Sequence, residues 1–427
     1  MPVYVLPILI LGAIAVEIPV AFAFIFGCAT FLIFDGFHPL SVIVSRLGPG
    51  LDSFPLIALP LFVFAGNLMN SAGIARRIFN FANSMVGHIS GGLGHVNVLA
   101  SIIFAGMSGV AQADAAGLGK IEIKEMRRAG YSEPFSAAIT AVSAIIGPII
   151  PPSGIMVIYA VLAGVALDKL FLAGFIPGLM LGGFLMITIY FLVKTGKVEA
   201  PLLPYTNWRK RGKAFIEAAP ALMLPGFLIF GLLSGIATPT ELGALTVTAA
   251  IILGFLQGEL SFQDLFHCAA QTVKTLGVLA ILIACAAPFT WIMGINNVSQ
   301  GLEHFFLGIS QNKYVFLLVI NVLLLLAGSI METTVILLIV VPIVSPLIAT
   351  YGIDPIHFGI IVILNLLLGT LTPPFGVLLF TMMDLTGISL YKLLRAIMPF
   401  YIPILLIILI ITFIPVITTF IPNLVGR

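Results

Sequence analysis

Two proline-rich octets interrupt apolar segments of this chain and constrain its fold more than any other feature. The first octet, GPIIPPSG, covers Gly147–Gly154, and the second, GTLTPPFG, covers Gly369–Gly376. Both fit the pattern G-x-x-x-P-P-x-G, once in each half of the chain. Because proline lacks a backbone donor and collides with the preceding helical turn, each octet predicts a break in a helix. The chain must therefore accommodate irregular backbone inside apolar surroundings twice.

The composition around these octets is that of a membrane protein. Of the 427 residues, 60% are hydrophobic and 8% are charged, whereas a soluble domain carries about 25% charged residues. Long apolar runs predict transmembrane helices. The apolar segments expected here are Val3–Val16, Ile18–Phe34, Phe54–Asn70, Pro134–Ala166, Leu170–Val193, Ala218–Leu233, Leu242–Phe255, Val273–Met293, Tyr314–Ala349, His357–Met383 and Pro399–Ile421. We expect an all-α polytopic membrane protein.

Several classes of function are disfavoured by the motifs that the sequence lacks. No Walker loop or dinucleotide fingerprint is present, which argues against ATP-driven transport. Cys28, Cys268 and Cys285 show no metal-binding spacing and are expected to pack as small hydrophobic residues. No serine–histidine–acid arrangement or acid pair points to chemistry on a substrate. We therefore expect no enzymatic activity, no transition metal and no nucleic-acid partner.

The basic residues are clustered, and the clusters constrain the topology. Most of the 19 lysines and arginines fall in groups that the positive-inside rule assigns to the cytoplasmic side. These groups are Arg76–Arg77, Lys120–Arg128, Lys194–Lys213, Lys274 and Lys392–Arg395. One apolar segment, roughly Val96–Leu118, separates the first two groups. A single crossing would place them on opposite sides, so this segment is expected to be a re-entrant hairpin.

Landmarks of the first half recur in the second half in the same order and at a nearly constant offset. The recurring pairs are Ala105-Gly106 with Ala327-Gly328, Pro151-Pro152 with Pro373-Pro374, Glu133-Pro134 with Asp354-Pro355, and Glu17 with Glu241. The first two pairs have the same offset in residue number, and the other two keep almost the same one. Similar hydrophobicity alone would not place two Pro-Pro pairs and two acidic-Pro pairs in register. The chain is therefore expected to contain an internal repeat.

The repeat and the basic clusters together predict the domain organisation. The first repeat is residues 1–193, with scaffold helices, a hairpin at about 94–122 and a broken helix at about 134–166. A basic cytoplasmic linker, 194–213, follows. The second repeat is residues 214–427, with scaffold helices, a hairpin at about 314–350 and a broken helix at about 357–383. Because the first half has an odd number of crossings, the two repeats are expected to be inverted.

Inverted repeats with interrupted helices at matching positions indicate a secondary transporter. Each break frees backbone carbonyls, which are tolerated in a membrane only when another group satisfies them. A sodium ion surrounded by carbonyl oxygens is one such solution, and the N-terminus of the following half-helix favours an anion. The sequence therefore predicts two cation sites that flank one anion site.

The centre of the first hairpin reads GMSGVAQADAAGLG and carries two candidate site residues. Ser108 at the tip either gives an oxygen to sodium or packs as a small residue between helices. Asp114 is an ionisable residue at membrane depth, which is a functional hypothesis by default. It either supports a bound cation or caps the second hairpin arm.

In the second hairpin, Ser329, Glu332, Thr333 and Thr334 hold the corresponding place. Glu332 is the costliest of these residues to bury. Three roles for it are open: neutralising a cation, capping the half-helix, or carrying a proton.

The octets add further candidates beside the breaks. Thr372 offers a hydroxyl in the second octet, where its counterpart Ile150 in the first octet offers only a carbonyl. Ser153 follows the first proline pair directly and is expected to face an anion.

With these motifs in view, the chain resembles the large membrane subunit (M, DctM-like) of tripartite ATP-independent periplasmic (TRAP) transporters over essentially its whole length. The motifs that carry the resemblance are PLFVFAGNLMNSAGIARRI at Pro60–Ile78, NVLASIIFAGMSG at Asn97–Gly109, ADAAGLGKIEIKEM at Ala113–Met126, IIGPIIPPSGIMVIY at Ile145–Tyr159, ATPTELGAL at Ala237–Leu245 and LLGTLTPPFG at Leu367–Gly376. The GYSEP arm, Gly130–Pro134, is similar to members of the sialic acid type.

The resemblance implies a sodium-driven elevator transporter of the bacterial inner membrane, built from a scaffold and a mobile transport domain. Its implied partners are a small Q membrane subunit and a soluble periplasmic binding protein, P. Its implied substrates are organic acids, including C4-dicarboxylates, keto acids and sialic acid. The implied residues are Ser108, Gly147, Ile150 and Asp114 for the first sodium site, Glu332, Gly369, Thr372 and Ser329 for the second, and Ser153, Pro151, Pro152, Pro373 and Pro374 for the substrate.

Two positions depart from the family pattern: Val110 stands where members often have a small hydroxyl residue, and Glu332 where many have aspartate.

Two other functions stay open from the sequence. A stand-alone sodium/dicarboxylate symporter of related fold would need no partner, so co-purification with a small membrane subunit distinguishes it. A scaffold or channel without coupled transport would show uptake that ignores the sodium gradient.

Overall fold

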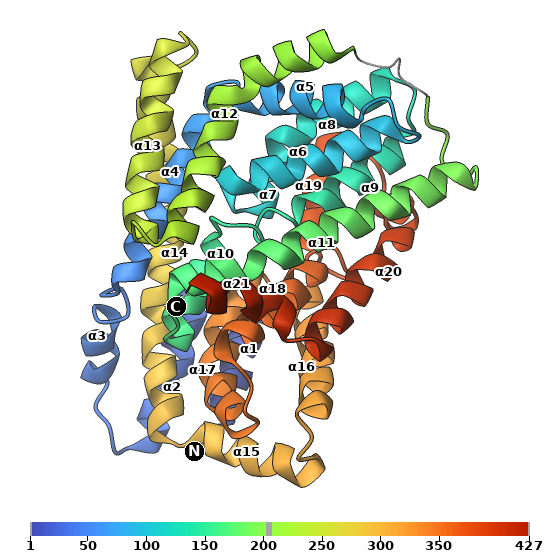
Figure 1. Ribbon diagram of the computed structural model, residues 1–427. Helices are drawn as coiled ribbons and strands as arrows, with labels where there is room; N and C mark the ends of the chain where they lie inside the picture. The colour runs from blue at the N-terminus through green and yellow to red at the C-terminus, as the bar shows by residue number, and fades with distance from the viewer. Residues whose placement is uncertain (1, 202–206, 426–427) are drawn as a thin grey trace.

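The computed structural model describes residues 2–201 and 207–425, apart from the side chain of Ser108, and its regular elements are helices (Figure 1). The first half contains α1 (Val5–Ala15), α2 (Val20–Asp35), α3 (Ser41–Leu47), η1 (Phe54–Ile57), α4 (Ala58–Ser71), α5 (Ile74–Val86), α6 (Gly92–Ser108), α7 (Ala111–Ala116), α8 (Leu118–Arg128), α9 (Glu133–Ala144), α10 (Gly154–Ala163) and α11 (Leu167–Lys194). The second half contains α12 (Trp208–Ser234), α13 (Pro239–Leu256), α14 (Phe262–Ile295), α15 (Val298–Ile309), α16 (Lys313–Ile330), α17 (Thr333–Thr350), α18 (Pro355–Gly369), α19 (Val377–Thr386), α20 (Leu390–Phe413) and α21 (Val416–Val425).

Eight segments among the described residues are long and apolar enough to cross a membrane. They are η1 with α4, then α11, α12, α13, α14, α16, α17 and α20. The helices beside the proline octets, α10, α18 and α19, are apolar but shorter. The expected all-α polytopic membrane fold is therefore confirmed.

The helices that carry two of the basic clusters lie at the same end of the molecule. In Figure 1, α5 and α8 lie at the upper end, whereas α15 lies at the lower end. The first hairpin, formed by α6, α7 and α8, therefore returns to the end from which it starts. On one side α4 packs against α13 and α14, while α9 and α11 pack against α20.

Both proline octets interrupt helices, as the sequence predicts. Helix α9 ends at Ala144 and α10 begins at Gly154. Helix α18 ends at Gly369 and α19 begins at Val377. In each octet the peptide bond between the two prolines is cis.

Local sequence determines where these half-helices begin and end. The Oγ of Ser153 caps α10 by accepting a first-turn N–H at 3.3 Å. The carboxylate of Asp354 caps α18 by accepting a first-turn N–H at 2.8 Å. Such side-chain acceptors satisfy donors that lack an intrahelical partner. Helices α10 and α19 are followed by Gly164 and Gly387, whose φ values of 65° and 72° suit glycine at a helix C-terminus.

The helix bounds recur along the chain in the same way as the sequence landmarks. Helix α7 begins at Ala111 and α17 at Thr333, while α11 begins at Leu167 and α20 at Leu390. These pairs of starts are separated by almost the same offset as the two octets. Each half thus presents a hairpin, a half-helix, a break, a second half-helix and a long helix in the same order.

Some elements differ from the expectation. The second arm of the first hairpin continues as α8 to Arg128 rather than ending near residue 122, because its lysines, glutamates and arginines favour helix although they end the apolar run. The expected closing span Pro399–Ile421 is divided between α20 and α21, since Pro415 cannot continue the helical hydrogen bonding. Helices α3, α5 and α15 are additional to the predicted segments, because they are short or amphipathic.

The second hairpin and the second break approach each other at two glycines. A Cβ on Gly328 would stand 3.1 Å from the Cα of Gly369, and a Cβ on Gly369 would collide with the backbone of Gly328. We expect Gly369→Ala to lower the free energy of unfolding by about 1–3 kcal/mol, because the obstructing atoms belong to backbone. Thermal unfolding of the purified chain in detergent measures the loss. Gly226→Ala is the control, since its Cβ meets no heavy atom within 4 Å; equal midpoints for the two variants would contradict the prediction.

Candidate functional site

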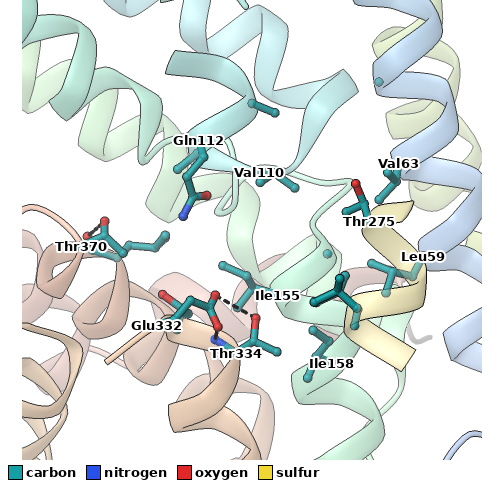
Figure 2. Close-up of a pocket in the computed structure, with 18 of the residues that line it drawn as sticks. Leu59, Val63, Val110, Gln112, Ile155, Ile158, Thr275, Glu332, Thr334 and Thr370 are labelled. Atoms are coloured by element: carbon teal, nitrogen blue, oxygen red, sulfur yellow. Dashed lines mark hydrogen bonds between the residues drawn. The ribbon is translucent and has the colours of Figure 1, made fainter. Parts of the chain in front are cut away.

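A cavity of about 610 Å³ lies where both hairpin tips meet the broken helices (Figure 2). Helices α7, α10, α17 and α18 contribute one part of the lining, and α4 and α14 contribute the other. The lining residues are Leu59, Val63, Gly66, Asn67, Asn70, Val110, Ala111, Gln112, Ala113, Gly154, Ile155, Ile158, Thr275, Val278, Leu279, Glu332, Thr333, Thr334, Leu367 and Thr370. Elements of both sequence halves therefore line one cavity.

The two hairpin tips face each other across this cavity. Figure 2 shows Gln112, in the first turn of α7, with its amide directed toward the tip that carries Glu332. The first tip turns at Gly109, whose φ of 61° favours glycine. A Cβ on Gly109 would also collide with the carbonyl of Pro152. The first tip is thus seated directly on the first octet.

The second tip is held by a helix cap. Glu332 is the N-cap of α17, and its Oε2 accepts the N–H of Thr334 at 2.9 Å and that of Val335 at 3.3 Å. Its Oε1 accepts the hydroxyl of Thr334 at 3.0 Å. Of the three roles that the sequence leaves open for Glu332, the structure shows capping. A carboxylate at this helix end is also favoured by the helix dipole.

Helices α4 and α14 form the other wall and are joined by polar contacts. The Nδ2 of Asn67 donates to the Oγ1 of Thr272 at 3.0 Å, and that hydroxyl donates to the carbonyl of Cys268 at 2.8 Å. Asn70 and Thr275 add an amide and a hydroxyl to the same wall of the cavity. The bond from Asn67 to Thr272 joins α4 to α14, and both helices contribute to this wall of the cavity.

The cavity carries little charge of its own. Among the described residues that line it, Glu332 is the single ionisable side chain; the other polar groups are amides and hydroxyls. Gly154 and Ile155, in the first turn of α10, lie in the lining, so the positive end of that helix dipole faces the cavity. An anion bound here would find hydrogen-bond donors and a helix N-terminus rather than a lysine or arginine.

The first break contains carbonyl oxygens that accept no hydrogen bond from the described residues. Within the described residues, no hydrogen bond ends on the carbonyl of Gly147 or Ile150. Asp114 is 2% exposed, and its carboxylate stands where a Cβ on Gly147 would lie. Carbonyl oxygens that accept no hydrogen bond, together with a buried carboxylate, are ligands that suit a sodium ion. Asp114 is the N-cap residue of neither hairpin helix, because that position is Val110 in α7 and Gly117 in α8.

The second break has its oxygens engaged in internal hydrogen bonds. The carbonyl of Gly369 accepts the N–H of Thr372 at 2.9 Å, and the hydroxyl of Thr372 donates to the carbonyl of Leu368 at 2.8 Å. The carbonyl of Ser329 accepts the N–H of Phe375 at 3.0 Å. A carbonyl has two lone pairs, so the carbonyl oxygens of Gly369 and Ser329 each retain one free acceptor position, whereas the carbonyl of Leu368 also accepts the N–H of Leu371 at 3.1 Å.

The residues expected at the substrate lie beside the cavity rather than on its surface. Ser153 is fully buried, and its Oγ donates to the carbonyl of Pro148 at 2.6 Å. The first diproline, Pro151-Pro152, is buried, whereas the second, Pro373-Pro374, is exposed. None of these residues is among the described residues that line the cavity. Ser108 is also expected at the first tip, but its side chain lies outside the described residues.

Sequence reasoning missed several polar residues of this region. Asn67, Asn70 and Thr275 lie on helices that the sequence predicts only as membrane spans, and their polarity was the available signal. Glu122 of α8 is 1% exposed and contacts Thr140, although lysines, a glutamate and arginines stand around it in the sequence. Only the packing of α8 against α9 reveals that burial.

Comparison with known proteins identifies the family. The family model described as "Tripartite ATP-independent periplasmic transporter, DctM component" matches residues 7–417. The chain is 42% identical to the sialic acid TRAP transporter large permease protein SiaM of Vibrio cholerae, over 97% of each protein. It is 35% identical to the C4-dicarboxylate TRAP transporter large permease protein DctM of Pseudomonas aeruginosa, over 94% of this chain and 93% of that protein.

A solved structure supports the fold independently. The YdaH transporter of Alcanivorax borkumensis matches with a TM-score of 0.65 and 13% identity, over 88% of each chain. At this identity the match concerns the fold alone. The proteins of the matched family are transport permeases, and no catalytic activity is indicated. Taken together, the motifs, the helix breaks and the match along nearly the whole length show that the chain belongs to the DctM component family of tripartite ATP-independent periplasmic transporters.

Proposed function

We propose that this chain is a sodium-driven large permease subunit that carries an organic acid anion across the bacterial inner membrane. The observation that carries the proposal is one cavity lined by both hairpin tips, the first turn of α10, the start of the second break and the α4–α14 wall. Such sites at the interface of repeats and discontinuous helices are typical of secondary transporters.

The proposed substrate is a sialic acid, with C4-dicarboxylates as the second choice. The similarity to SiaM of Vibrio cholerae exceeds that to DctM of Pseudomonas aeruginosa. The amides of Asn67, Asn70 and Gln112 and the hydroxyls of Thr275 and Thr370 suit a substrate rich in hydroxyl and amide groups. A cavity of about 610 Å³ lies in the usual size range for small-molecule sites.

Sodium is proposed to supply the charge that the cavity lacks. Burying an anion without compensation is costly, and the lining offers no cationic side chain among its described residues. A sodium ion at the carbonyls of Gly147 and Ile150, supported by Asp114, would place positive charge next to the first tip. The second sodium is proposed at Ser329, Gly369 and Thr372. Glu332, whose carboxylate caps α17, adds negative charge nearby.

The two walls of the cavity suggest how the substrate moves. The α4–α14 wall is proposed to belong to a static scaffold, and the hairpins with the broken helices to a transport domain that slides past it as an elevator. The partners proposed for this subunit are a small Q membrane subunit and a periplasmic binding protein that delivers the anion. A stand-alone symporter is the weaker alternative, because the matched family is one component of a tripartite system.

Reconstituted uptake tests the function directly. The chain, a Q subunit and a binding protein are placed in proteoliposomes, and uptake of labelled sialic acid and succinate is followed. We expect uptake of sialic acid that requires an inward sodium gradient and the binding protein, because sodium binding compensates the anion. Uptake that persists when potassium replaces sodium on both sides would contradict sodium coupling.

Asp114→Asn tests the first sodium site. Removing the carboxylate charge beside Gly147 is expected to raise the sodium concentration for half-maximal uptake by about tenfold, which corresponds to roughly 1.4 kcal/mol. Asp52→Asn is the matched control, because Asp52 is exposed and far along the chain from either hairpin. Identical sodium curves for the two variants would remove Asp114 from the site.

Thr372→Ala tests the second site in the same assay. We expect a higher sodium requirement with normal membrane insertion, since the hydroxyl beside the break is lost. Thr381→Ala is the matched control, because Thr381 makes the same kind of bond, to the carbonyl of Val377 at 3.0 Å, inside α19. A sodium requirement that changes equally in both variants would point to a general helix effect.

A further inference from the structure

A second cleft, of about 340 Å³, lies outside the transport cavity on the face of α8. Its lining consists of Lys120, Ile123, Lys124, Arg127 and Arg128 of α8 and Leu385 near the end of α19. The four cationic residues stand at positions i, i+4, i+7 and i+8 of one helix, so they share one face. Ile123 and Leu385 give the cleft an apolar floor between the charges.

The positive charge of the cleft is only partly neutralised by the protein. Arg127 pairs with Glu133 at 2.8 Å, and Arg128 pairs with Glu125 at 2.9 Å. Lys120 and Lys124 form no ion pair with any described residue. Two exposed ammonium groups therefore remain over the apolar floor, with two guanidinium groups beside them.

The surroundings of the cleft suit a lipid better than a soluble anion. Helix α19, which carries Leu385, packs against α20. The start of α20 exposes Tyr391, at 73%, and further along the same helix Met398, at 62%, beside the basic residues Lys392 and Arg395. Exposed tyrosines next to lysines and arginines are typical of the membrane–water boundary. A phospholipid placed there would direct its phosphate to the lysines and its glycerol and upper chains to the apolar floor.

We propose that the cleft between α8 and the end of α19 binds the headgroup of an anionic phospholipid of the cytoplasmic leaflet. Basic pockets between membrane helices on the cytoplasmic side bind such headgroups, and each lysine or arginine near the surface contributes appreciably. The lipid would contact the second arm of the first hairpin and the half-helix after the second break. It would thus connect elements of the two sequence halves at residues that do not line the cavity. This inference goes beyond the proposed function and does not depend on the identity of the transported acid.

Short-chain lipids provide the test. The purified full chain in neutral detergent is titrated with dioctanoyl-phosphatidylglycerol, and binding is followed by native mass spectrometry. Changing Lys120 and Lys124 together to glutamine removes two charges and keeps good helix formers. We expect the affinity for the lipid to fall by about 30-fold, because each of the two lysine charges contributes about fivefold. Changing the same pair to arginine is expected to retain affinity, which separates lost charge from a damaged helix.

The controls distinguish lipid binding at this cleft from a general attraction of anionic lipid to basic residues. Arg209→Gln with Lys210→Gln removes the same charge at the start of α12, where both residues are exposed, and is expected to leave affinity within twofold. Equal losses in the two glutamine pairs, or equal binding of dioctanoyl-phosphatidylcholine, would overturn the proposal. Displacement of the lipid by inorganic phosphate of similar affinity would assign the cleft to a soluble anion and would also overturn it.

Discussion

The structure depends on how backbone polar groups are satisfied where two helices stop inside apolar surroundings. An unpaired carbonyl or N–H in a membrane costs several kcal/mol, so a break survives only when other groups contact it. Here a hairpin tip packs against each break. The first tip places Gly109 against the carbonyl of Pro152, and the second places the carbonyl of Ser329 on the N–H of Phe375. The breaks and the tips are therefore one structural unit in each half.

The two units are similar in order but differ in chemistry. At the first break, the carboxylate of Asp114 lies against Gly147, whereas at the second break the backbone of Gly328 lies against Gly369. The first diproline is buried and the second is exposed. The first break is thus buried and lies against a carboxylate, whereas the second lies against backbone and exposes its prolines.

Several features of this fold were predictable, because they follow from neighbouring residues. The octets predicted both breaks, and the acidic-Pro pairs marked the starts of α9 and α18, where Asp354 serves as the cap. The wall of Asn67 and Thr275 was not predictable, because the two lie on helices whose contact depends on the tertiary fold. The burial of Glu122 was missed for the same reason: it stands in a run of charges, and its burial depends on the packing of α8 against α9 and other helices.

By itself the sequence determined where the two octets break their helices, since proline, glycine and capping side chains act within a few residues of themselves. It also determined the membrane class through its apolar content. Only the tertiary structure decided which oxygens remain without donors, which residues line the cavity, and that Ser153 turns inward to Pro148. These outcomes depend on contacts between segments that lie far apart in the chain, such as α4 with α14, and no local pattern encodes a distance between such segments.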